Sequence, residues 1–479
     1  MGDELWRWSA CDLAAAIAKR EVSCAEAVGA VVDRVRATNG EINAIVDDLT
    51  DEALEQAAAQ DRALAAGGPL GPLHGVPVTV KINVDYKGRA TTNGVEAFQS
   101  VIAPADAPVV HNLRHAGAII VGRTNTPEFS FRATTDNVVH GRTLNPWDPE
   151  RSPGGSSGGS SAACAMGYGP IAHGNDIGGS LRFPSFMCGL ATVRPTQGRV
   201  PAYNPSQAEE RGLLAQLMST QGVIAREVRD VRLGTRIVAQ GDPRDPLWVP
   251  APFDGPAPGG PVKVAVTRDG LGYAIDPAIT AAVDKAAGLL ADAGYAVEEV
   301  DPPLAAEAAD RWGQDTMGEV RVMMEPAIRK YGSPTIQAIF DNYFAHFGVS
   351  EPVALIRALA DRSRLLRAWT TFLDDHPLVL TPFLMRPTYA WDEDTWGQDE
   401  IGDLFDAGRY SYLMNYLGLP AAVVPIGLHG DGDGSVPIGV QIVGQRFRED
   451  MCLDAAEAIE ARVGIMAREL WRRQDAAAA

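Results

Sequence analysis

The chain has 479 residues, of which 46% are hydrophobic and 22% charged, a balance typical of a globular protein rather than a disordered one. Its 42 Lys and Arg residues against 61 Asp and Glu residues give a net charge of −19, which supplies no basic face for a polyphosphate and excludes nucleic acid as a partner. No run of about 18 apolar residues is present to span a bilayer, and no secretory signal precedes the first helix, so we expect a cytoplasmic protein that does not bind membranes. The five scattered cysteines predict reduced thiols rather than a disulfide framework.

The first sixty residues predict helices. Ser9 and Ser23 each stand three positions before an acidic residue, Asp12 or Glu26, and each precedes an apolar periodic run. We therefore expect a capping box at the start of two helices. Glycines and prolines over 67–75 end this region.

Strands and helices then alternate toward the middle of the chain. Asp106 is expected to cap a helix and Gly117 to stop it. The expected elements are a strand over 76–82, a helix over 109–115, a strand over 118–121 and an alanine-rich helix ending near 168. This alternation predicts an α/β layered fold.

The C-terminal half begins with a Pro- and Gly-rich segment that predicts a linker over 241–261. The expected elements after it are a strand over 262–267, a helix over 277–293, a strand over 296–300, a helical region over about 303–375, strands over 378–380, 421–425 and 438–443, and a last helix over 449–473 with a disordered alanine tail. The helical region holds Trp312, Met323, Met324, Tyr343 and Phe344, which either pack in the core or face a substrate as a cover.

The segment 152–184 is dominated by Gly and Ser and carries the chemistry. A flexible linker does not explain it, because an alanine-rich helix and an apolar run lie between its two Gly/Ser turns. A phosphate cradle would need the GxxxxGK[ST] or GxGxxG pattern, and neither is present. The stretch 154–158 satisfies G-x-S-x-G, but that nucleophile turn needs a late histidine, and the late histidines His346, His376 and His429 are not in a convincing context.

A serine after two glycines explains more of this segment. The backbone N–H groups of Ile177, Gly178, Gly179 and Ser180 can surround a reacting carbonyl as an oxyanion hole beside the Ser180 hydroxyl. A nucleophilic serine needs a base. Lys81 lies in an apolar strand, where a desolvated lysine loses its charge and can accept a proton, although a strand-end lysine usually reaches solvent.

These motifs resemble the amidase signature family. The stretch GPLHGVPVTVKINVDYKG is similar to the lysine-bearing strand of that family, and SPGGSSGGSSAA with GNDIGGSLRFPS is similar to its Gly/Ser signature, including the 24-residue spacing from Ser156 to Ser180. The resemblance covers nearly the whole chain. It implies a single α/β domain with a central mixed β-sheet covered by helices on both faces. The expected regions are a helical start (1–65), a signature core (66–240), an inserted cover region (241–375) and a return to the core with a C-terminal helix (376–479).

The resemblance also implies the site residues. Ser180 would be the acyl-forming nucleophile, Ser156 a proton relay after a cis Gly155–Ser156 bond, and neutral Lys81 the general base. Asp176 and Arg182 would brace the signature loop, and Ser130 would lie on the substrate side. No metal or cofactor is expected, and the protein would act as a monomer or homodimer. Two departures from the family pattern, Ile82 and Asn175, affect the surroundings of Lys81.

Three functions are compatible with these motifs. The first is a free-standing amidase that cleaves acyl amides, with anilides, esters or carbamates reached by the same acyl transfer. The second is the glutamine-amidase component of a tRNA-dependent amidotransferase, but the bulky apolar stretch 381–396 does not suit glutamine, and only Arg386 there could hold its carboxylate. The third is a non-catalytic binding relative. We expect the pocket-lining residues to come from 202–220 and 303–400.

Overall fold

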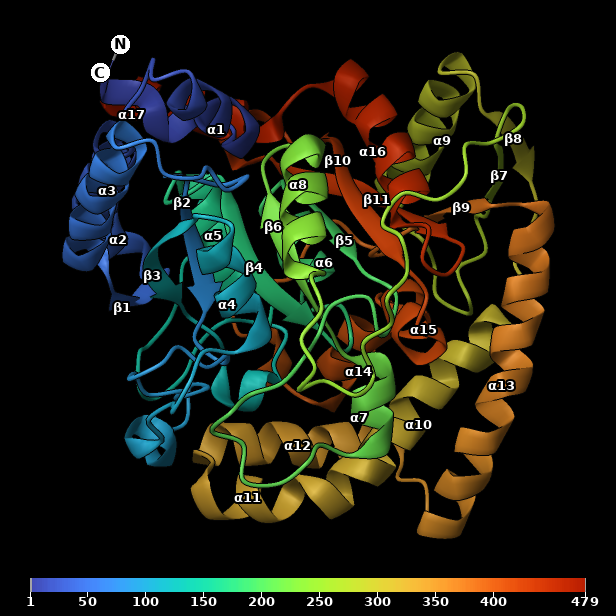
Figure 1. Ribbon diagram of the computed structural model, residues 1–479. Helices are drawn as coiled ribbons and strands as arrows, with labels where there is room; N and C mark the ends of the chain where they lie inside the picture. The colour runs from blue at the N-terminus through green and yellow to red at the C-terminus, as the bar shows by residue number, and fades with distance from the viewer. Residues whose placement is uncertain (1, 479) are drawn as a thin grey trace.

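One eleven-stranded sheet organises the chain in the computed structural model, which describes residues 2–478 (Figure 1). The strands lie in the order β1-β3-β2-β4-β6-β5-β10-β11-β9-β7-β8. Their bounds are β1 Ile45–Asp48, β2 Pro77–Lys81, β3 Ile119–Thr124, β4 Ile171–Asp176, β5 Ala191–Arg194, β6 Thr220–Ala225, β7 Lys263–Val266, β8 Ala296–Glu299, β9 Leu378–Pro382, β10 Ala421–His429 and β11 Val436–Gly444.

The sheet is mixed. β2 pairs in parallel with both β3 and β4, and β7 pairs in parallel with both β8 and β9. The strands from β4 to β9 in the middle of the sheet pair antiparallel. The predicted mixed α/β fold is therefore confirmed. β7 and β8 come from the expected inserted region and extend this same sheet, while the division of the chain into four regions stays a prediction.

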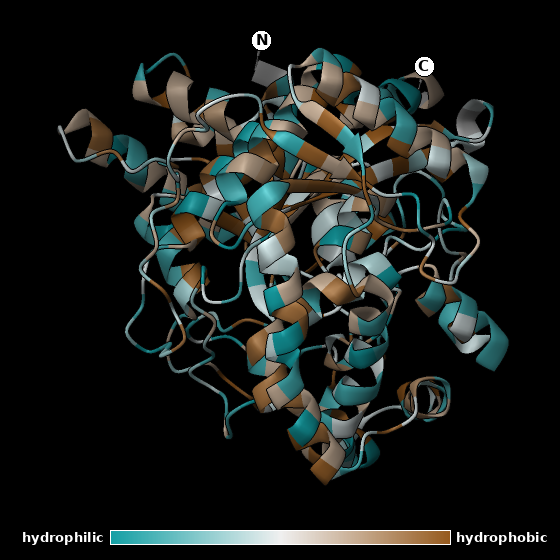
Figure 2. Ribbon diagram, turned by 90° about the vertical axis from the view of Figure 1, so that its right-hand side faces the viewer, coloured by the Kyte–Doolittle hydropathy of each residue, from teal (hydrophilic) through white to brown (hydrophobic). Residues whose placement is uncertain are grey.

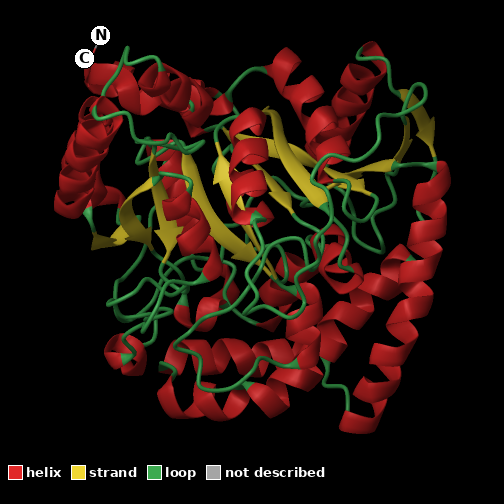
Figure 3. Ribbon diagram, viewed as in Figure 1, coloured by secondary structure: helices red, strands yellow, loops and turns green. Residues whose placement is uncertain are grey.

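Helices surround the sheet (Figure 3). Their bounds are α1 Ala10–Ala18, α2 Cys24–Ile42, α3 Thr50–Ala65, α4 Pro108–His115, α5 Gly158–Met166, α6 Arg182–Met187, α7 Leu213–Met218, α8 Val228–Val238, α9 Pro277–Asp292, α10 Ala305–Met323, α11 Glu325–Tyr331, α12 Pro334–Phe347, α13 Pro352–Asp375, α14 Gln398–Asp406, α15 Arg409–Leu417, α16 Glu449–Val463 and α17 Met466–Ala478. In Figure 1, α10, α11 and α12 lie below the sheet and α13 runs along its right side.

The strand sequences explain why helices are needed on both faces. Every residue of β2, β3, β5, β9 and β11 is buried, so neither face of the sheet is left to solvent. Figure 2 shows the strands of the interior mainly in brown, with teal residues on the outer helices. Within residues 2–478, no helix combines the length and the apolar character that crossing a membrane requires.

The N-terminal helices begin largely as predicted. Ser23 and Glu26 form the full capping box of α2. At α1 the Ser9 hydroxyl accepts the Asp12 N–H, but the Asp12 carboxylate pairs with Arg229. The prediction of helices throughout this region was wrong at β1, a short strand that pairs antiparallel with β3.

Asp106 does not cap α4. Its carboxylate accepts the Lys87 N–H and pairs with Arg114, and the helix begins after Ala107 with Pro108 in its first turn. Proline is well suited to that position because its missing N–H would have no partner there. Gly117 follows the helix as predicted, with φ +89°.

The C-terminal prediction was also partly wrong. The expected single helix is two helices, α16 and α17, separated at Gly464, and the alanine tail continues α17 to Ala478. Trp471 donates to the Ala165 carbonyl, and Arg7 donates to Asp475. These contacts hold the last helix against the body of the molecule, so the tail is helical.

Candidate active site

The parallel pairing of β2 and β4 assembles the site. Lys81 is the last residue of β2 and Asp176 the last of β4, and the carboxyl ends of parallel strands meet at the same edge of a sheet. The chain after β4 turns through Ile177 to Ser180 at that edge. The loop before α5 carries Ser156, which places all three predicted catalytic residues at one end of two adjacent strands.

Lys81 is completely buried, so the reading of a strand-end lysine that reaches solvent was wrong. Its Nζ lies 2.6 Å from Ser156 Oγ, 2.8 Å from Asn175 Oδ1 and 3.1 Å from Ser157 Oγ. Burial lowers the pKa of Lys81 well below its ordinary value, because the ammonium ion loses its hydration, while the Asp176 carboxylate acts weakly in the opposite sense. These surroundings favour the neutral amine.

The side-chain amides of Asn83 and Asn175 fix where this amine can donate. Asn175 Nδ2 donates to Asn83 Oδ1 at 3.0 Å, which leaves Asn175 Oδ1 as the acceptor that faces Lys81. A neutral amine has two N–H groups and one lone pair. With the N–H groups directed to Asn175 and Ser157, the lone pair points to Ser156. The sequence marked Asn175 only as a departure from the family pattern, and Asn83 was missed.

Ser156 and Ser180 both line the main cavity, a space of about 400 Å³. The peptide bond Gly155–Ser156 is cis, as the resemblance implied. Ser156 is buried, whereas Ser180 is half-buried. Among the described residues the Ser180 hydroxyl has no hydrogen-bond partner, so it is free to meet a substrate in the cavity.

Fewer backbone N–H groups are available for an oxyanion hole than the sequence indicated. The Gly179 N–H already donates to Asp176 Oδ1 at 2.8 Å, in a turn where Gly179 has φ +117°, a conformation that favours glycine. The N–H groups of Ile177, Gly178 and Ser180 have no acceptor among the described residues. These three groups are the available donors beside the Ser180 hydroxyl.

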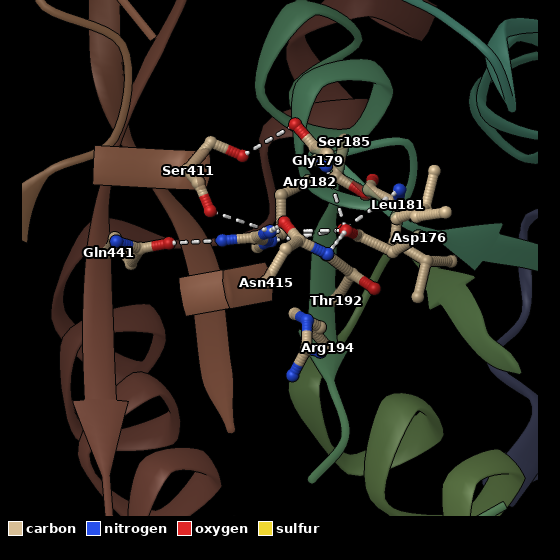
Figure 4. A network of polar contacts seen from close by, with 12 residues as sticks. Asp176, Gly179, Leu181, Arg182, Ser185, Thr192, Arg194, Ser411, Asn415 and Gln441 are labelled. Atoms are coloured by element: carbon tan, nitrogen blue, oxygen red, sulfur yellow. Dashed lines mark hydrogen bonds and ion pairs between the residues drawn. The ribbon is translucent and has the colours of Figure 1, made fainter. Parts of the chain in front are cut away.

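Asp176 and Arg182 brace this turn from behind (Figure 4). Their side chains are fully buried and joined at 3.0 Å, and Arg182 also reaches Asn415 at 2.6 Å and Gln441 at 2.8 Å. Burial alone would raise the pKa of Asp176, but Arg182, Arg194 and the Asn415 amide together outweigh it and lower that pKa to about 2. The Leu181 N–H joins the same carboxylate at 3.2 Å, so the ion pair ties the backbone on both sides of Ser180 to the core.

Ser130 lies in the main cavity wall, with φ +56°. Its hydroxyl donates to Asn93 Oδ1 at 2.6 Å and accepts from Asn83 Nδ2 at 2.9 Å. Through Asn83 it is connected to Asn175 and so to the surroundings of Lys81.

The main cavity is lined by the signature turn and by residues of the segment 202–221, which includes α7. Residues of α10 between Thr316 and Met323 also line it, as does Met324, which follows α10. The expectation that pocket-lining residues come from 202–220 and 303–400 is confirmed. A smaller space of about 60 Å³, the aromatic lobe, adjoins Ser180. Its aromatic lining residues are Phe131, Phe183, Trp312, Tyr343, Tyr389, Phe405 and Tyr412.

The sequence left open whether the large side chains of the helical region pack in the core or face a substrate, and they divide between core packing and the lining of the cavities. Trp312 and Tyr343 are buried and line the aromatic lobe, whereas Phe344 is core packing. Met323 is 47% exposed and lines the main cavity with Met324. The Trp312 indole N–H donates to the Ile177 carbonyl at 3.1 Å, a link between cover and signature turn that the sequence did not indicate.

The late histidines and Arg386 lie outside this site. None of His346, His376 and His429 lines the main cavity or the aromatic lobe as the structure describes them. Arg386 pairs with Glu393 and Asp403, so its charge is already matched.

The histidine that does approach the site was missed. His173 Nδ1 accepts the Lys81 backbone N–H at 3.4 Å, and Nε2 meets Gln221 Oε1 at 2.9 Å. Burial is the main influence on this ring and lowers the pKa of His173 to about 4, which keeps it neutral. A neutral ring is suited to holding the Lys81 backbone in place.

Several known proteins are similar to this chain in sequence or in fold. A family model described as Amidase matches residues 26–453. An indoleacetamide hydrolase of Bradyrhizobium diazoefficiens is 50% identical over 98% of this chain and 89% of its own. A glutamyl-tRNA(Gln) amidotransferase component of Moorella thermoacetica is 31% identical over 95% of this chain and 97% of its own. The solved structure of a bacterial aryl acylamidase of the amidase signature family superposes with a TM-score of 0.83 at 26% identity, covering 97% of both chains.

Proposed function

The chain belongs to the amidase signature family and is an amidase, and we propose that it hydrolyses primary amides of arylacetic acids through an acyl-enzyme on Ser180. The observation that carries the proposal is the 2.6 Å contact between buried Lys81 and Ser156 in a cavity that also receives the free Ser180 hydroxyl. Family membership and the assembly of these three residues argue against a non-catalytic binding relative.

The proton route follows from the lone pair of Lys81. Neutral Lys81 takes the proton of Ser156 as Ser156 takes that of Ser180, and Ser180 Oγ attacks the amide carbon. The resulting oxyanion accepts from the N–H groups of Ile177, Gly178 and Ser180. The proton then returns through Ser156 to the departing nitrogen, the C–N bond breaks and ammonia leaves. Water attacks the acyl-enzyme by the same route and releases the carboxylate product.

Two observations support an aromatic acyl group. The Bradyrhizobium relative, an indoleacetamide hydrolase by name, is 50% identical over nearly the whole chain. The aromatic lobe adjoins Ser180 and brings Trp312, Phe405 and Tyr412 around the end of the signature turn. Aromatic side chains pack favourably against a planar ring. The main cavity, at about 400 Å³, lies within the range of small-molecule sites.

The test is ammonia release from indole-3-acetamide by the wild-type protein and by Ser180→Ala. We expect turnover by the wild type and a loss of about 10⁴-fold or more in the variant, with unchanged thermal unfolding. A matching anilide, ester and carbamate define the leaving group. Equal hydrolysis by the wild type and Ser180→Ala would remove Ser180 from the mechanism.

Glutamine belongs in the same substrate panel, because the Moorella amidotransferase component is 31% identical over 95% of the chain. We expect glutamine to be a poor substrate, because the aromatic side chains of the lobe beside Ser180 favour a flat apolar acyl group over the charged chain of glutamine. Arg386, the residue that the sequence offered for its carboxylate, is already paired. Glutamine turnover above that of indole-3-acetamide would favour the amidotransferase function instead.

We further propose that the enzyme works in the cytoplasm as a monomer or homodimer. The five cysteines are free thiols in the structure, and four of them are buried. Such thiols are compatible with a reducing compartment.

A further inference from the structure

Arg211 is the single Arg or Lys among the described residues that line the main cavity. It also lines a neighbouring side cavity of about 300 Å³, which touches neither Ser156 nor Ser180. Arg211 therefore stands where the two spaces adjoin, away from the catalytic serines. The sequence offered no reason to single it out.

The Arg211 guanidinium is only partly matched. Nη1 donates to Ser219 Oγ at 2.6 Å, and within the described chain neither Nε nor Nη2 has an acceptor or a carboxylate within ion-pair distance. Two buried arginines are more fully matched: Arg132 is paired with Asp394, and both terminal nitrogens of Arg194 donate to carbonyls. Burial lowers the pKa of Arg211, but an arginine stays charged across the working range of proteins.

The free nitrogens form a geometric unit. Nε and Nη2 lie on one edge of the planar guanidinium, and their N–H groups are parallel. This edge matches the two oxygens of a carboxylate, which makes a bidentate pair. Among the described residues, neither Nε nor Nη2 of Arg211 is a buried polar atom without a partner. This edge of the guanidinium is therefore open to the cavity.

The nearby carboxylates of Asp245, Glu210 and Glu319 act on Arg211 from a distance, and among the described residues none of them forms an ion pair with it. Glu319 accepts the N–H groups of Leu214 and Ala215, and Asp245 accepts that of Ala202. Glu210 is exposed at the rim and accepts from Gln207.

Helix α10 adds a second polar group without a partner to the lining of the main cavity. The Thr316 hydroxyl is buried, lines the main cavity and has no hydrogen-bond partner in the described part of the chain. Thr316 precedes Glu319 by three residues on α10, so the two side chains share a face. Glu319 in turn is pressed against Gly212, where an added Cβ would lie 2.1 Å from it. Arg211 directly precedes Gly212 in the chain, and Arg211 and Thr316 both line the main cavity.

We propose that Arg211 binds a carboxylate inside the main cavity, with the Thr316 hydroxyl beside it. The inference deepens the proposed function and rests on it only for the identity of the probes. Two sources carry this chemistry: the carboxylate product of amide hydrolysis, and a second carboxylate at the far end of the acyl group. A carboxylate there completes a charge-assisted, bidentate contact in a partly desolvated site.

Direct binding tests the site without turnover. Phenylacetate is titrated into the wild type, Arg211→Gln and Arg211→Lys by calorimetry, with 2-phenylethanol as the neutral probe. We expect Arg211→Gln to weaken phenylacetate about ten- to a hundredfold and leave the alcohol unchanged, with Arg211→Lys between. The control is Arg357→Gln, an exposed arginine on α13. Equal phenylacetate affinity in the wild type and both Arg211 variants would overturn the proposal.

Kinetics separates the two sources. If the product is the ligand, phenylacetate inhibits phenylacetamide hydrolysis competitively, and Arg211→Gln raises its inhibition constant by the same factor as it weakens binding in calorimetry, while Arg357→Gln leaves the inhibition constant unchanged. If the substrate carries the group, 4-carboxyphenylacetamide exceeds phenylacetamide in kcat/KM, and Arg211→Gln removes the advantage through KM. Failure of both amides to react would count against the proposed function, while the calorimetric result would still decide the role of Arg211.

Discussion

Two regions form the sides of the main cavity, and they differ in how completely their polar groups are paired. In the signature region, Lys81 has three partners, and Asp176 and Arg182 hold each other and the backbone around Ser180. In the second region, called the recognition side and made of the segment 202–219 with α7 and of α10, Arg211 keeps one edge free and the Thr316 hydroxyl has no partner among the described residues. The comparison supports the proposal of a preorganised catalytic half and a recognition half whose polar groups a ligand completes.

The largest expected effect removes the base from the signature region. Lys81→Met keeps the volume of the buried side chain but leaves Ser156 without a proton acceptor, so kcat/KM for amide hydrolysis should fall about 10³-fold or more. The measurement is steady-state ammonia release, with thermal unfolding as a check on the fold. Lys87→Met, at an exposed lysine six residues later, is the control and should keep wild-type activity. A loss smaller than tenfold in Lys81→Met would mean that another group is the base.

The next effect concerns stability. Asp176→Asn leaves the Arg182 guanidinium buried without its counter-charge, which should lower the free energy of unfolding by about 3–5 kcal/mol in denaturant titrations. Asp12→Asn breaks an exposed pair with Arg229 and should cost about 0–1 kcal/mol. Similar losses in the two variants would contradict the difference between the regions.

The same carboxylate predicts a pH dependence. The pKa of Asp176 is lowered to about 2 in the folded protein, so its stabilising contribution is present above the ordinary aspartate range near pH 4 and is lost as the pH falls toward 2. This portion of the acid destabilisation should be missing in Asp176→Asn.

A smaller effect changes only the charge beside the base. Asn175→Asp places a carboxylate where an amide oxygen now lies 2.8 Å from Lys81 Nζ, which raises the pKa of Lys81 and favours the ammonium form. Activity at neutral pH should fall about tenfold or more, and the rising limb of the pH profile of kcat/KM should move to higher pH. Gln207→Glu adds the same charge on the recognition side and should leave the rising limb of the pH profile of kcat/KM where it is. An unmoved limb in Asn175→Asp would contradict a neutral lysine base.

The smallest effect tests the link between the regions. Trp312→Phe removes the hydrogen bond to the Ile177 carbonyl, which orients the Ile177–Gly178 peptide group and with it the Gly178 N–H, so kcat should fall about tenfold with little change in KM. Trp369→Phe is the matched control, because the Trp369 indole N–H has no partner among the described residues. An equal kcat loss in both variants would mean that Trp312 acts through packing alone.

The sequence could point to the three residues proposed as catalytic because their signals are local. The lysine-bearing strand, the Gly/Ser turns and the spacing from Ser156 to Ser180 are each legible without a fold. β4 was missed, since IAHGND mixes glycine and polar residues that strands usually avoid, and only its pairing with β2 and β6 makes it a strand.

The supporting residues could not be predicted because their partners are distant in the chain. Asn83 meets Asn175 from 92 residues away, and Trp312 reaches Ile177 from 135 residues away. The exposed edge of Arg211 depends on how α10 packs against α7, which no local pattern in the sequence encodes. Local motifs therefore led to the proposed reaction, whereas the contacts around the site depend on packing between distant parts of the chain.

The two ends of the sheet have a consequence for behaviour in concentrated solution. β1 and β8 are the outermost strands, and each carries two adjacent acidic residues, Asp47 with Asp48 and Glu298 with Glu299. Unpaired backbone at a strand edge invites another chain to add itself, and repulsion between like charges discourages that addition. The acidic residues at each open margin therefore disfavour the addition of another chain to the sheet.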